Sequence, residues 1–406
     1  MIFIKKNFKA LFFLLIFGFT IYSSYLILTT SLQFNSDNSL VLLASRFLSR
    51  HIALLPNQSL PLGDVSDYFN NFYLYFGPFP SIVLMPLVLL FGLNFPQVWL
   101  GIGSIIASFI LIYLISKHFN FNKIDSLWLS LFFVFSTVVF SAGLIDISAY
   151  QVEVLGVPLV LFALYEYLTR KRPLLIGLFL GLAVMTRITL IFSVVFFIFE
   201  FLYKRISKRQ LVILLIPILI SLILLGLYNQ RRFHSFFELG YKYSINLSSY
   251  PLSNNLKYGY ISPIHIPGNL YAMLVMPPEP LLKDKDGFVL KFPYLKVSPW
   301  GLAIWYTSPL FLFLLFRFKR NVYSISALVT TIILLIPILL YFSIGFAQFG
   351  YRYELDFLPF LFLLLIPCLP KKLSKPVILL ITLGVIFNCL YITSLWGVYP
   401  QFGIHF

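Results

Sequence analysis

Long apolar runs separated by short basic clusters constrain this chain more than any other feature. The runs 8–30, 211–228 and 321–344 are each close to the roughly 20 residues that a helix needs to cross a bilayer. Hydrophobic residues make up 60% of the chain and charged residues 11%, which leaves too much apolar surface for a soluble fold to bury. Because lipid offers no hydrogen-bond partner to the backbone, the runs are predicted to be helices. We therefore expect an all-α, polytopic membrane protein.

One apolar segment has to stay out of the membrane path. Counting 77–93 as a crossing would invert the side of every later basic cluster, whereas Lys and Arg normally gather in cytoplasmic loops. The segment is short, and Pro78, Pro80 and Pro86 interrupt a regular helix, so we expect it to be re-entrant or interfacial. About eleven crossings remain, at roughly 8–30, 97–116, 124–145, 150–169, 173–186, 188–203, 210–228, 299–316, 321–344, 357–370 and 376–396.

The basic clusters then fall on the side of the N-terminus. A net charge of +16 would suggest nucleic-acid binding in a soluble protein, but short clusters between apolar runs are typical of cytoplasmic loops. We expect no nucleic-acid partner, and we predict a multi-pass plasma-membrane protein with a cytoplasmic N-terminus and an active external face. The cytoplasmic clusters are Lys5/Lys6/Lys9, Lys117/Lys123, Arg170/Lys171/Arg172, Lys204/Arg205/Lys208/Arg209, Arg317/Lys319/Arg320 and Lys371/Lys372/Lys375.

Two external segments are too long to be turns and divide the chain. Residues 1–228 form an N-terminal transmembrane catalytic module whose first external loop is 31–96. A large external loop, 229–298, follows, and 299–406 supplies the C-terminal transmembrane helices. Within the first loop, 40–48 is predicted to be an interfacial helix capped by Ser36 or Asp37. The loop 229–298 is too aromatic for a disordered linker, so we expect it to fold onto the membrane surface.

Three acidic residues near the external boundary are candidates for catalysis. Asp37 follows the first run, although such a residue is equally often a helix cap. Asp146 follows the third crossing and Glu153 comes seven residues later, so a regular helix would present both on one face. Carboxylates at membrane depth are costly and usually face a cavity. Asp64 and Asp67 are more typical of a solvated turn.

Four of the arginines predicted on the external side, against the usual charge bias, are candidates for binding a phosphate. Arg187 interrupts a long apolar stretch, and either a salt bridge to Asp146 or Glu153 or an anchored phosphate would explain it. Arg231, Arg232 and Arg352 share this side, where an anionic lipid head would hold them. Pairing with Glu354 or Asp356 is the alternative for Arg352.

The sequence contains no P-loop, dinucleotide fingerprint, nucleophile elbow or zinc motif. The two cysteines, Cys368 and Cys389, lie in apolar runs without metal-ligand spacing. No cofactor is therefore indicated with certainty. Whether Asp37 and Asp146 hold a divalent cation is left open by the sequence.

This arrangement resembles the polytopic glycosyltransferases of the GT-C fold. Several short sequence stretches also resemble the dolichyl-phosphate-mannose protein mannosyltransferase-like group of those enzymes, family 39. The similar stretches are YLYFGPFP at 73–80, GLAVMTR at 181–187 and RFHSFFELGY at 232–241. Those enzymes carry one acidic residue soon after the first span and a second after the third, positions that Asp37 and Asp146 match. Many relatives have paired acids where Asn38 follows Asp37 here, and some have a Lys near the position of Tyr75.

The resemblance implies sugar transfer from a polyprenyl-phosphate donor to a lipid, glycan or protein acceptor at the external face. Asp37 would act as general base, and the sugar would invert. Asp146 or Glu153 would orient the acceptor or bind a divalent ion. Membrane lipids are further expected partners. The residues predicted to bind substrate or stabilise the departing lipid phosphate are Arg187, Arg231, Arg232, Arg352, Asp64, Asp67 and Tyr75.

Other functions fit parts of the same pattern. A transporter or flippase of lipid-linked intermediates would share the basic, polytopic character, but such proteins often show internal repeats, and this sequence has none. A non-catalytic GT-C-like protein that binds lipid carriers is a further alternative, as is a polymerase or ligase of surface polysaccharide. The large external loop and the gathering of polar groups on one side favour an enzyme.

Overall fold

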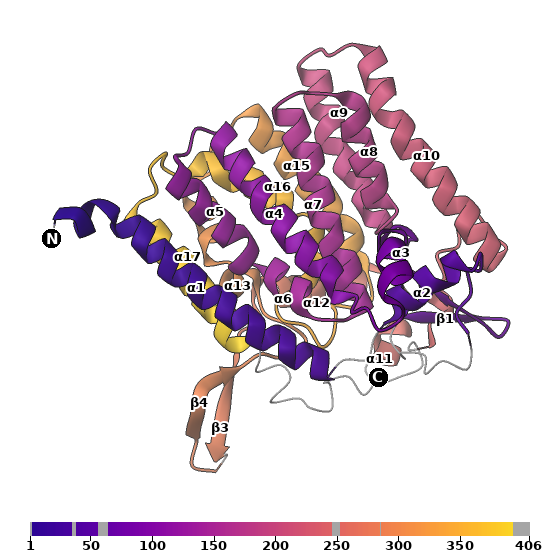
Figure 1. Cartoon of the computed structure of the whole chain (residues 1–406), viewed down its shortest axis with the longest axis horizontal. Coiled ribbons are helices and arrows are strands. Elements are labelled where there is room, and N and C mark those ends of the chain that lie inside the picture. Colours follow the sequence, from indigo (N-terminus) through magenta and orange to yellow (C-terminus); the bar gives the residue numbers. More distant parts are fainter. Residues whose placement is uncertain (1, 35–37, 56–63, 246–251, 285, 393–406) are drawn as a thin grey trace.

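The computed structural model describes residues 2–34, 38–55, 64–245, 252–284 and 286–392 of the chain. Helices account for 68% of the structure, which agrees with the prediction of a predominantly helical protein. Most of them lie side by side in one bundle, with smaller elements attached at one end (Figure 1).

Within the residues that the structure describes, five helices are long and apolar enough to cross a membrane. A sixth candidate is a pair of helices, α5 (Lys123–Phe135) and α6 (Val138–Leu144), which meet at a bend of 60°. These helices are consistent with a membrane protein. The five are α1 (Ile2–Phe34), α4 (Val98–His118), α7 (Ser148–Leu168), α10 (Lys208–Phe233) and α15 (Val322–Leu340).

The outer helices present apolar side chains to the surroundings. α7 is 89% buried over its most apolar stretch, whereas α1 is 28% buried, so α7 lies in the centre and α1 at the periphery. Apolar residues recur at helical spacing along the exposed face of α10, which would be costly in water and is expected in lipid. They are Val212, Ile216, Leu219, Ile220, Ile223, Leu224 and Leu227.

The other predicted crossings correspond to shorter helices, several of which begin at a proline. Their lengths do not establish by themselves that they cross a membrane, so eleven crossings stay a prediction. These elements are α8 (Pro173–Val184), η1 (Ile188–Ser193), α9 (Val194–Tyr203), α13 (Ile304–Thr307), η5 (Pro309–Leu312), α14 (Phe313–Arg317), α16 (Leu358–Leu365), η7 (Ile366–Cys368) and α17 (Lys375–Tyr391).

The first external segment contains a helix, a β-hairpin and a second helix. α2 (Ser39–Leu48) begins after Asn38, which makes no side-chain cap, and the predicted caps Ser36 and Asp37 lie outside the described residues. The hairpin of β1 (Val65–Tyr68) and β2 (Asn71–Leu74) corrects the prediction of an all-α chain.

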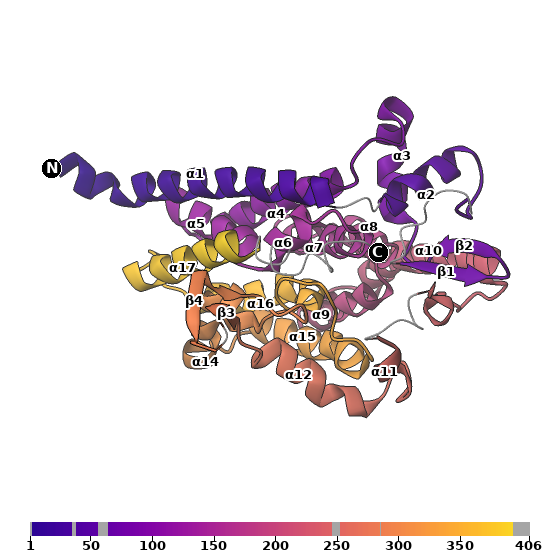
Figure 2. The same ribbon diagram turned by 90° about the horizontal axis from the view of Figure 1, so that it is seen from below.

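α3 (Phe79–Phe91) occupies the segment predicted not to cross. Its 13 residues span about 20 Å, against a hydrocarbon core of about 30 Å. Figure 2 shows α3 and α2 standing to one side of the bundle.

The second external segment is folded as well. It contains η2 (Tyr241–Tyr243), α11 (Leu252–Leu256), η4 (Pro263–His265) and α12 (Ile266–Leu274). A second hairpin, of β3 (Glu279–Asp284) and β4 (Val289–Lys296), projects from the bundle (Figure 1). Ser66 donates to the Gly240 carbonyl at 2.7 Å, so the first and second external segments lie together.

Polar contacts gather at the two ends of the bundle. At one, here the lysine end, Lys9 Nζ lies 3.1 Å from Oδ1 of Asp125, and Lys371 donates to the Phe119 carbonyl at 2.6 Å. At the other, here the loop end, the two hairpins, α2 and α12 are found, and η6 (Arg352–Asp356) connects to α16.

Candidate functional site

Two arginines converge on one carboxylate at the loop end. Nη1 of Arg187 lies 2.6 Å from Oε1 of Glu153, and Nε of Arg352 lies 3.6 Å from Oε2 of the same residue. Nη2 of Arg187 is also 3.4 Å from Oδ2 of Asp356. Each arginine side chain is 15% exposed, whereas those of Glu153 and Asp356 are 6% and 1% exposed. The guanidinium groups therefore stay reachable while their acidic partners are buried.

The local backbone explains why Arg187 reaches this point. α8 ends at Val184, and the chain is extended at Arg187 before η1 begins. Glu153 comes from the first turns of the central helix α7, and Arg352 begins η6. Three separate segments thus supply the cluster. Of the two partners predicted for Arg187, the structure selects Glu153, and Arg352 pairs with Glu153 rather than with Glu354 or Asp356.

The ion pairs leave hydrogen-bonding capacity unused. Nη1 of Arg187, Nε of Arg352 and Oε2 of Glu153 are buried, and within the described parts of the chain none of these atoms makes a hydrogen bond. Burial lowers the pKa of Arg187, but the carboxylates of Asp356 and Glu153 outweigh this effect and the pKa is raised, so the group stays charged. Nη1 of Arg187 already faces a carboxylate oxygen at 2.6 Å, whereas Nε of Arg352 lies 3.6 Å from its carboxylate partner and is a buried donor that a ligand oxygen would satisfy.

Tyrosine rings surround the two guanidinium groups. The ring of Tyr353 lies 5.5 Å from the guanidinium of Arg187 and 5.3 Å from that of Arg352. The Tyr150 ring lies 5.0 Å from Arg352, and its hydroxyl donates to the Ala347 carbonyl at 2.6 Å. Such cation–π contacts fix each guanidinium without neutralising it.

The first external segment reaches the same cluster. The Tyr75 hydroxyl donates to Oδ1 of Asp64 at 2.5 Å, and the Tyr75 ring stacks 4.6 Å from that of Tyr241. Burial and then the carboxylate of Asp64 raise the pKa of Tyr75, whereas the charge of Arg187 opposes the rise in the pKa of Tyr241. A carboxylate, two phenols and an arginine therefore lie within electrostatic range of one another.

A close backbone contact holds this segment in place. Gly77 packs against the carbonyl of Met185, and the Phe79 amide donates to the same carbonyl at 3.3 Å. A side chain at Gly77 would occupy the space of the Met185 oxygen. The contact places Tyr75 beside the short connection between α8 and η1 that carries Arg187.

The remaining predicted site residues differ in their surroundings. Asp146 is buried and precedes α7, which begins at Ser148, so it does not share a regular helix with Glu153. Asp67 accepts the Asn70 amide at 3.0 Å in the turn of the first hairpin. Asp37 lies outside the described residues.

Arg231 and Arg232 differ although they are neighbours. Arg231 is exposed, whereas Arg232 is 1% exposed. The guanidinium of Arg232 donates to the carbonyl of Leu74, to that of Phe76 at 3.5 Å and to Oδ1 of Asn229 at 2.6 Å. Through these contacts Arg232 holds the first external segment against α10.

Sequence reasoning did not single out Tyr241, Tyr341 or Tyr353. The only signal for them was the aromatic richness of the external segments. Among the described residues, no group of three or more His, Cys, Asp or Glu side chains could hold a metal ion. Because Asp37 is not described, the divalent ion predicted between Asp37 and Asp146 stays a prediction.

Comparison with known proteins adds no further assignment. No protein-family model, no curated protein and no solved structure matches the chain significantly.

Proposed function

We propose that this chain is a GT-C-type membrane glycosyltransferase that takes a sugar from a polyprenyl-phosphate donor at the loop end. The observation that carries the proposal is the convergence of Arg187 and Arg352, whose side chains are each 15% exposed, on the single carboxylate of Glu153 at one end of the helical bundle. Guanidinium forks match phosphate oxygens, and a lipid-linked phosphate reaches a protein at this depth.

The path of the chain supports the proposal of eleven crossings with the lysine end in the cytoplasm. Contacts at the two ends follow one another along the sequence in a way that fits ten passages, and α17, which begins at the lysine end, would be the eleventh. Contacts at the lysine end involve Lys9, Phe119, Tyr167, Lys204, Tyr323 and Leu373. Contacts at the loop end involve Leu40, Glu153, Arg187, Arg232, Tyr341 and Arg352. The positive-inside rule then places the loop end outside.

In the proposed reaction, the oxygen of an acceptor hydroxyl attacks the anomeric carbon of the sugar. Asp37 accepts the hydroxyl proton as general base. The bond between the anomeric carbon and the phosphate oxygen breaks, and its electron pair leaves with the polyprenyl phosphate. Arg187 and Arg352 stabilise that charge as it develops. One direct displacement inverts the anomeric configuration.

Within this proposal Asp64 and Tyr75 contact the sugar. Their hydrogen bond places a carboxylate and a phenol beside Tyr241, and such groups suit a ligand with many hydroxyls. Asp146 keeps the role of orienting the acceptor. Arg231, which is exposed, is available to the carrier phosphate, whereas Arg232 acts on the fold.

The test is transfer from a labelled polyprenyl-phosphate sugar in membranes that contain the full chain. Asp37→Asn is expected to lower transfer about 100-fold or more. Arg187→Lys and Arg352→Lys keep the charge but lose the planar fork, and each is expected to lower transfer at least about tenfold. Arg172→Lys at the lysine end is the matched control and should transfer normally. Near-normal transfer by Asp37→Asn would remove Asp37 as the base.

One observation also fits a non-catalytic carrier-binding protein: each guanidinium already has an internal carboxylate partner. Binding and turnover separate the two functions. If wild-type protein binds polyprenyl phosphate in an Arg187-dependent manner but transfers no sugar to lipid, glycan or peptide acceptors, the carrier-binding function is correct and the enzymatic proposal is wrong.

A further inference from the structure

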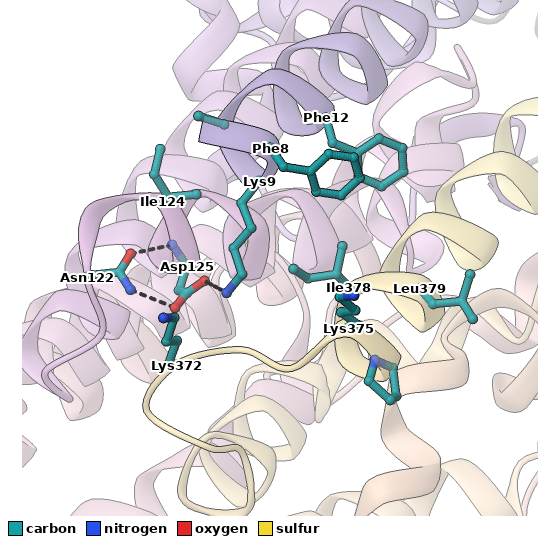
Figure 3. Close-up of a pocket in the computed structure, with 12 residues that line it drawn as sticks. Phe8, Lys9, Phe12, Asn122, Ile124, Asp125, Lys372, Lys375, Ile378 and Leu379 are labelled. Atoms are coloured by element: carbon teal, nitrogen blue, oxygen red, sulfur yellow. Dashed lines mark hydrogen bonds and ion pairs between the residues drawn. The ribbon is translucent and has the colours of Figure 1, made fainter. Parts of the chain in front are cut away.

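A cavity lies at the lysine end, far along the bundle from the arginine cluster. Its volume is about 800 Å³, and α1, α5 and the start of α17 surround it (Figure 3). Apolar side chains form most of its wall, and two lysines stand at the start of α17. The residues that matter here are Phe8, Phe12, Ile378, Leu379, Lys372 and Lys375.

A buried carboxylate fixes the three elements around this cavity. Asp125 is 0% exposed, and its oxygens accept from Lys9 Nζ at 3.1 Å, from Asn122 Nδ2 at 2.6 Å and from the Leu373 amide at 3.1 Å. Lys9 also donates to the Leu373 carbonyl at 2.6 Å. Because Asp125 links α1, α5 and the segment before α17, the shape of the cavity does not depend on a ligand.

The same network decides which charges remain for a ligand. Asp125 neutralises Lys9. Lys372 and Lys375 are exposed, and Figure 3 draws no interaction from either of them to another lining residue. The polar rim of the cavity thus carries two positive charges that its only carboxylate does not balance.

The apolar wall continues into the lipid-facing surface. Phe8 is 56% exposed and Leu379 is 57% exposed, and Leu11 and Leu383, one turn further along their helices, are 46% and 50% exposed. A ligand that satisfies both parts of the cavity needs an anionic head and long apolar chains. Cationic pockets between membrane helices at the cytoplasmic side bind lipid heads in this way.

We infer that this cavity binds the phosphate head of an anionic glycerophospholipid, with its acyl chains along α1 and α17. Lys372 and Lys375 contact the phosphodiester, and Phe8, Phe12 and Leu379 contact the chains. The inference does not depend on glycosyl transfer, and it requires only that the lysine end lie at a membrane boundary.

The experiment titrates the full-length, detergent-purified protein with phosphatidylglycerol and, as the zwitterionic reference, phosphatidylcholine, and counts bound lipids by native mass spectrometry. Wild-type protein should bind more phosphatidylglycerol than phosphatidylcholine at the same lipid concentration. The double variant Lys372→Gln/Lys375→Gln should lose that preference about tenfold or more, since each surface lysine contributes a roughly fivefold effect. Lys208→Gln/Arg209→Gln removes two exposed charges at the same end, away from the cavity, and should bind as wild type does.

Three results would overturn the inference. The first is no preference for phosphatidylglycerol in the wild type. The second is an equal loss in the two double variants, which would indicate surface charge alone. The third is a preference of the cavity for polyprenyl phosphate over phosphatidylglycerol, lost with the two lysines, which would make the occupant a carrier lipid. All variants bear exposed substitutions and are checked for monodispersity.

Discussion

Nη1 of Arg187 lies 2.6 Å from Oε1 of Glu153, while the other carboxylate oxygen faces Arg352 at 3.6 Å. Glu153 thus occupies the position, between two guanidinium groups, that a phosphate would take. The acid holds both arginines in place in the free protein, and an entering anion would compete with it.

Glu153→Gln should therefore destabilise the free protein and strengthen its response to an anion. Removing one partner of a buried ion pair typically costs about 3–5 kcal/mol of folding stability. Arg187 would keep its second carboxylate partner, Asp356, so its charge would stay partly balanced. Adding polyprenyl phosphate should raise the melting temperature of the variant more than that of the wild type, measured in detergent. Glu166→Gln, whose partner Arg172 is exposed at the lysine end, should respond as wild type does. Equal ligand-induced shifts in wild type and Glu153→Gln would refute the competition.

Arg232→Ala should unfold the first external segment, whereas Arg231→Ala should not. The first substitution leaves the buried carbonyls of Leu74 and Phe76 without their donor, for an expected loss of about 3 kcal/mol or more. The second removes an exposed side chain and should change stability by less than about 0.5 kcal/mol. Thermal unfolding and proteolysis of 38–78 measure both. Similar losses would contradict the assignment of Arg232 to the fold.

Gly77→Ala should be severe, because a Cβ atom there would lie 2.0 Å from the Met185 oxygen. The α8–η1 connection that carries Arg187 or the segment that carries Tyr75 would have to move, with an expected loss of about 2 kcal/mol or more in the melting analysis. Gly103→Ala is the control, since nothing lies within 4 Å of its Cβ position in α4. There the greater helix propensity of Ala should stabilise the protein by up to about 1 kcal/mol. A Gly77→Ala protein as stable as wild type would show that this contact is not tight.

Glu354 should make stability depend on pH. Burial raises the pKa of its carboxyl from 4.5 to about 8, although the Val138 amide opposes the shift. The folded protein thus holds this proton more tightly than the unfolded chain does. The resulting stability is fully present below pH 4.5 and is lost as the pH rises through about 8, by at most on the order of 5 kcal/mol.

Glu354→Gln lacks this contribution, so its melting temperature relative to wild type should rise between about pH 4 and about pH 9, a range that brackets the two pKa values. Glu279→Gln, at a partly exposed ion pair with Lys296, should show no such trend. A difference between Glu354→Gln and wild type that stays constant with pH would mean that Glu354 does not titrate in this range.

Local sequence patterns predicted much of the architecture. Apolar runs near the thickness of a bilayer predict helices because lipid leaves the backbone no other partner. The three prolines within 77–93 and its shortness predict that this segment does not cross, and α3, at 13 residues, is shorter than the five candidate spans. The first hairpin went unnoticed because its turn has no glycine: Phe69 and Asn70 adopt the left-handed conformation themselves, with φ of 52° and 61°.

Local sequence could not predict which side chains pair across the bundle. Arg352 was expected to pair within its own segment, but η6 turns Glu354 toward the start of α6, and Arg352 faces α7 instead. Arg231 and Arg232 are adjacent and chemically identical, and only the rotation of α10 against the first external segment exposes one and buries the other.

The sequence by itself determined the helical, apolar character of this chain and predicted a membrane protein with a basic end and a polar end, because hydrophobicity and charge act residue by residue. Only the tertiary structure decided that Glu153 serves two arginines and that Asp125 fixes a cavity at the lysine end. Contacts of a few ångströms depend on how helices distant in sequence pack, and no local pattern carries that information.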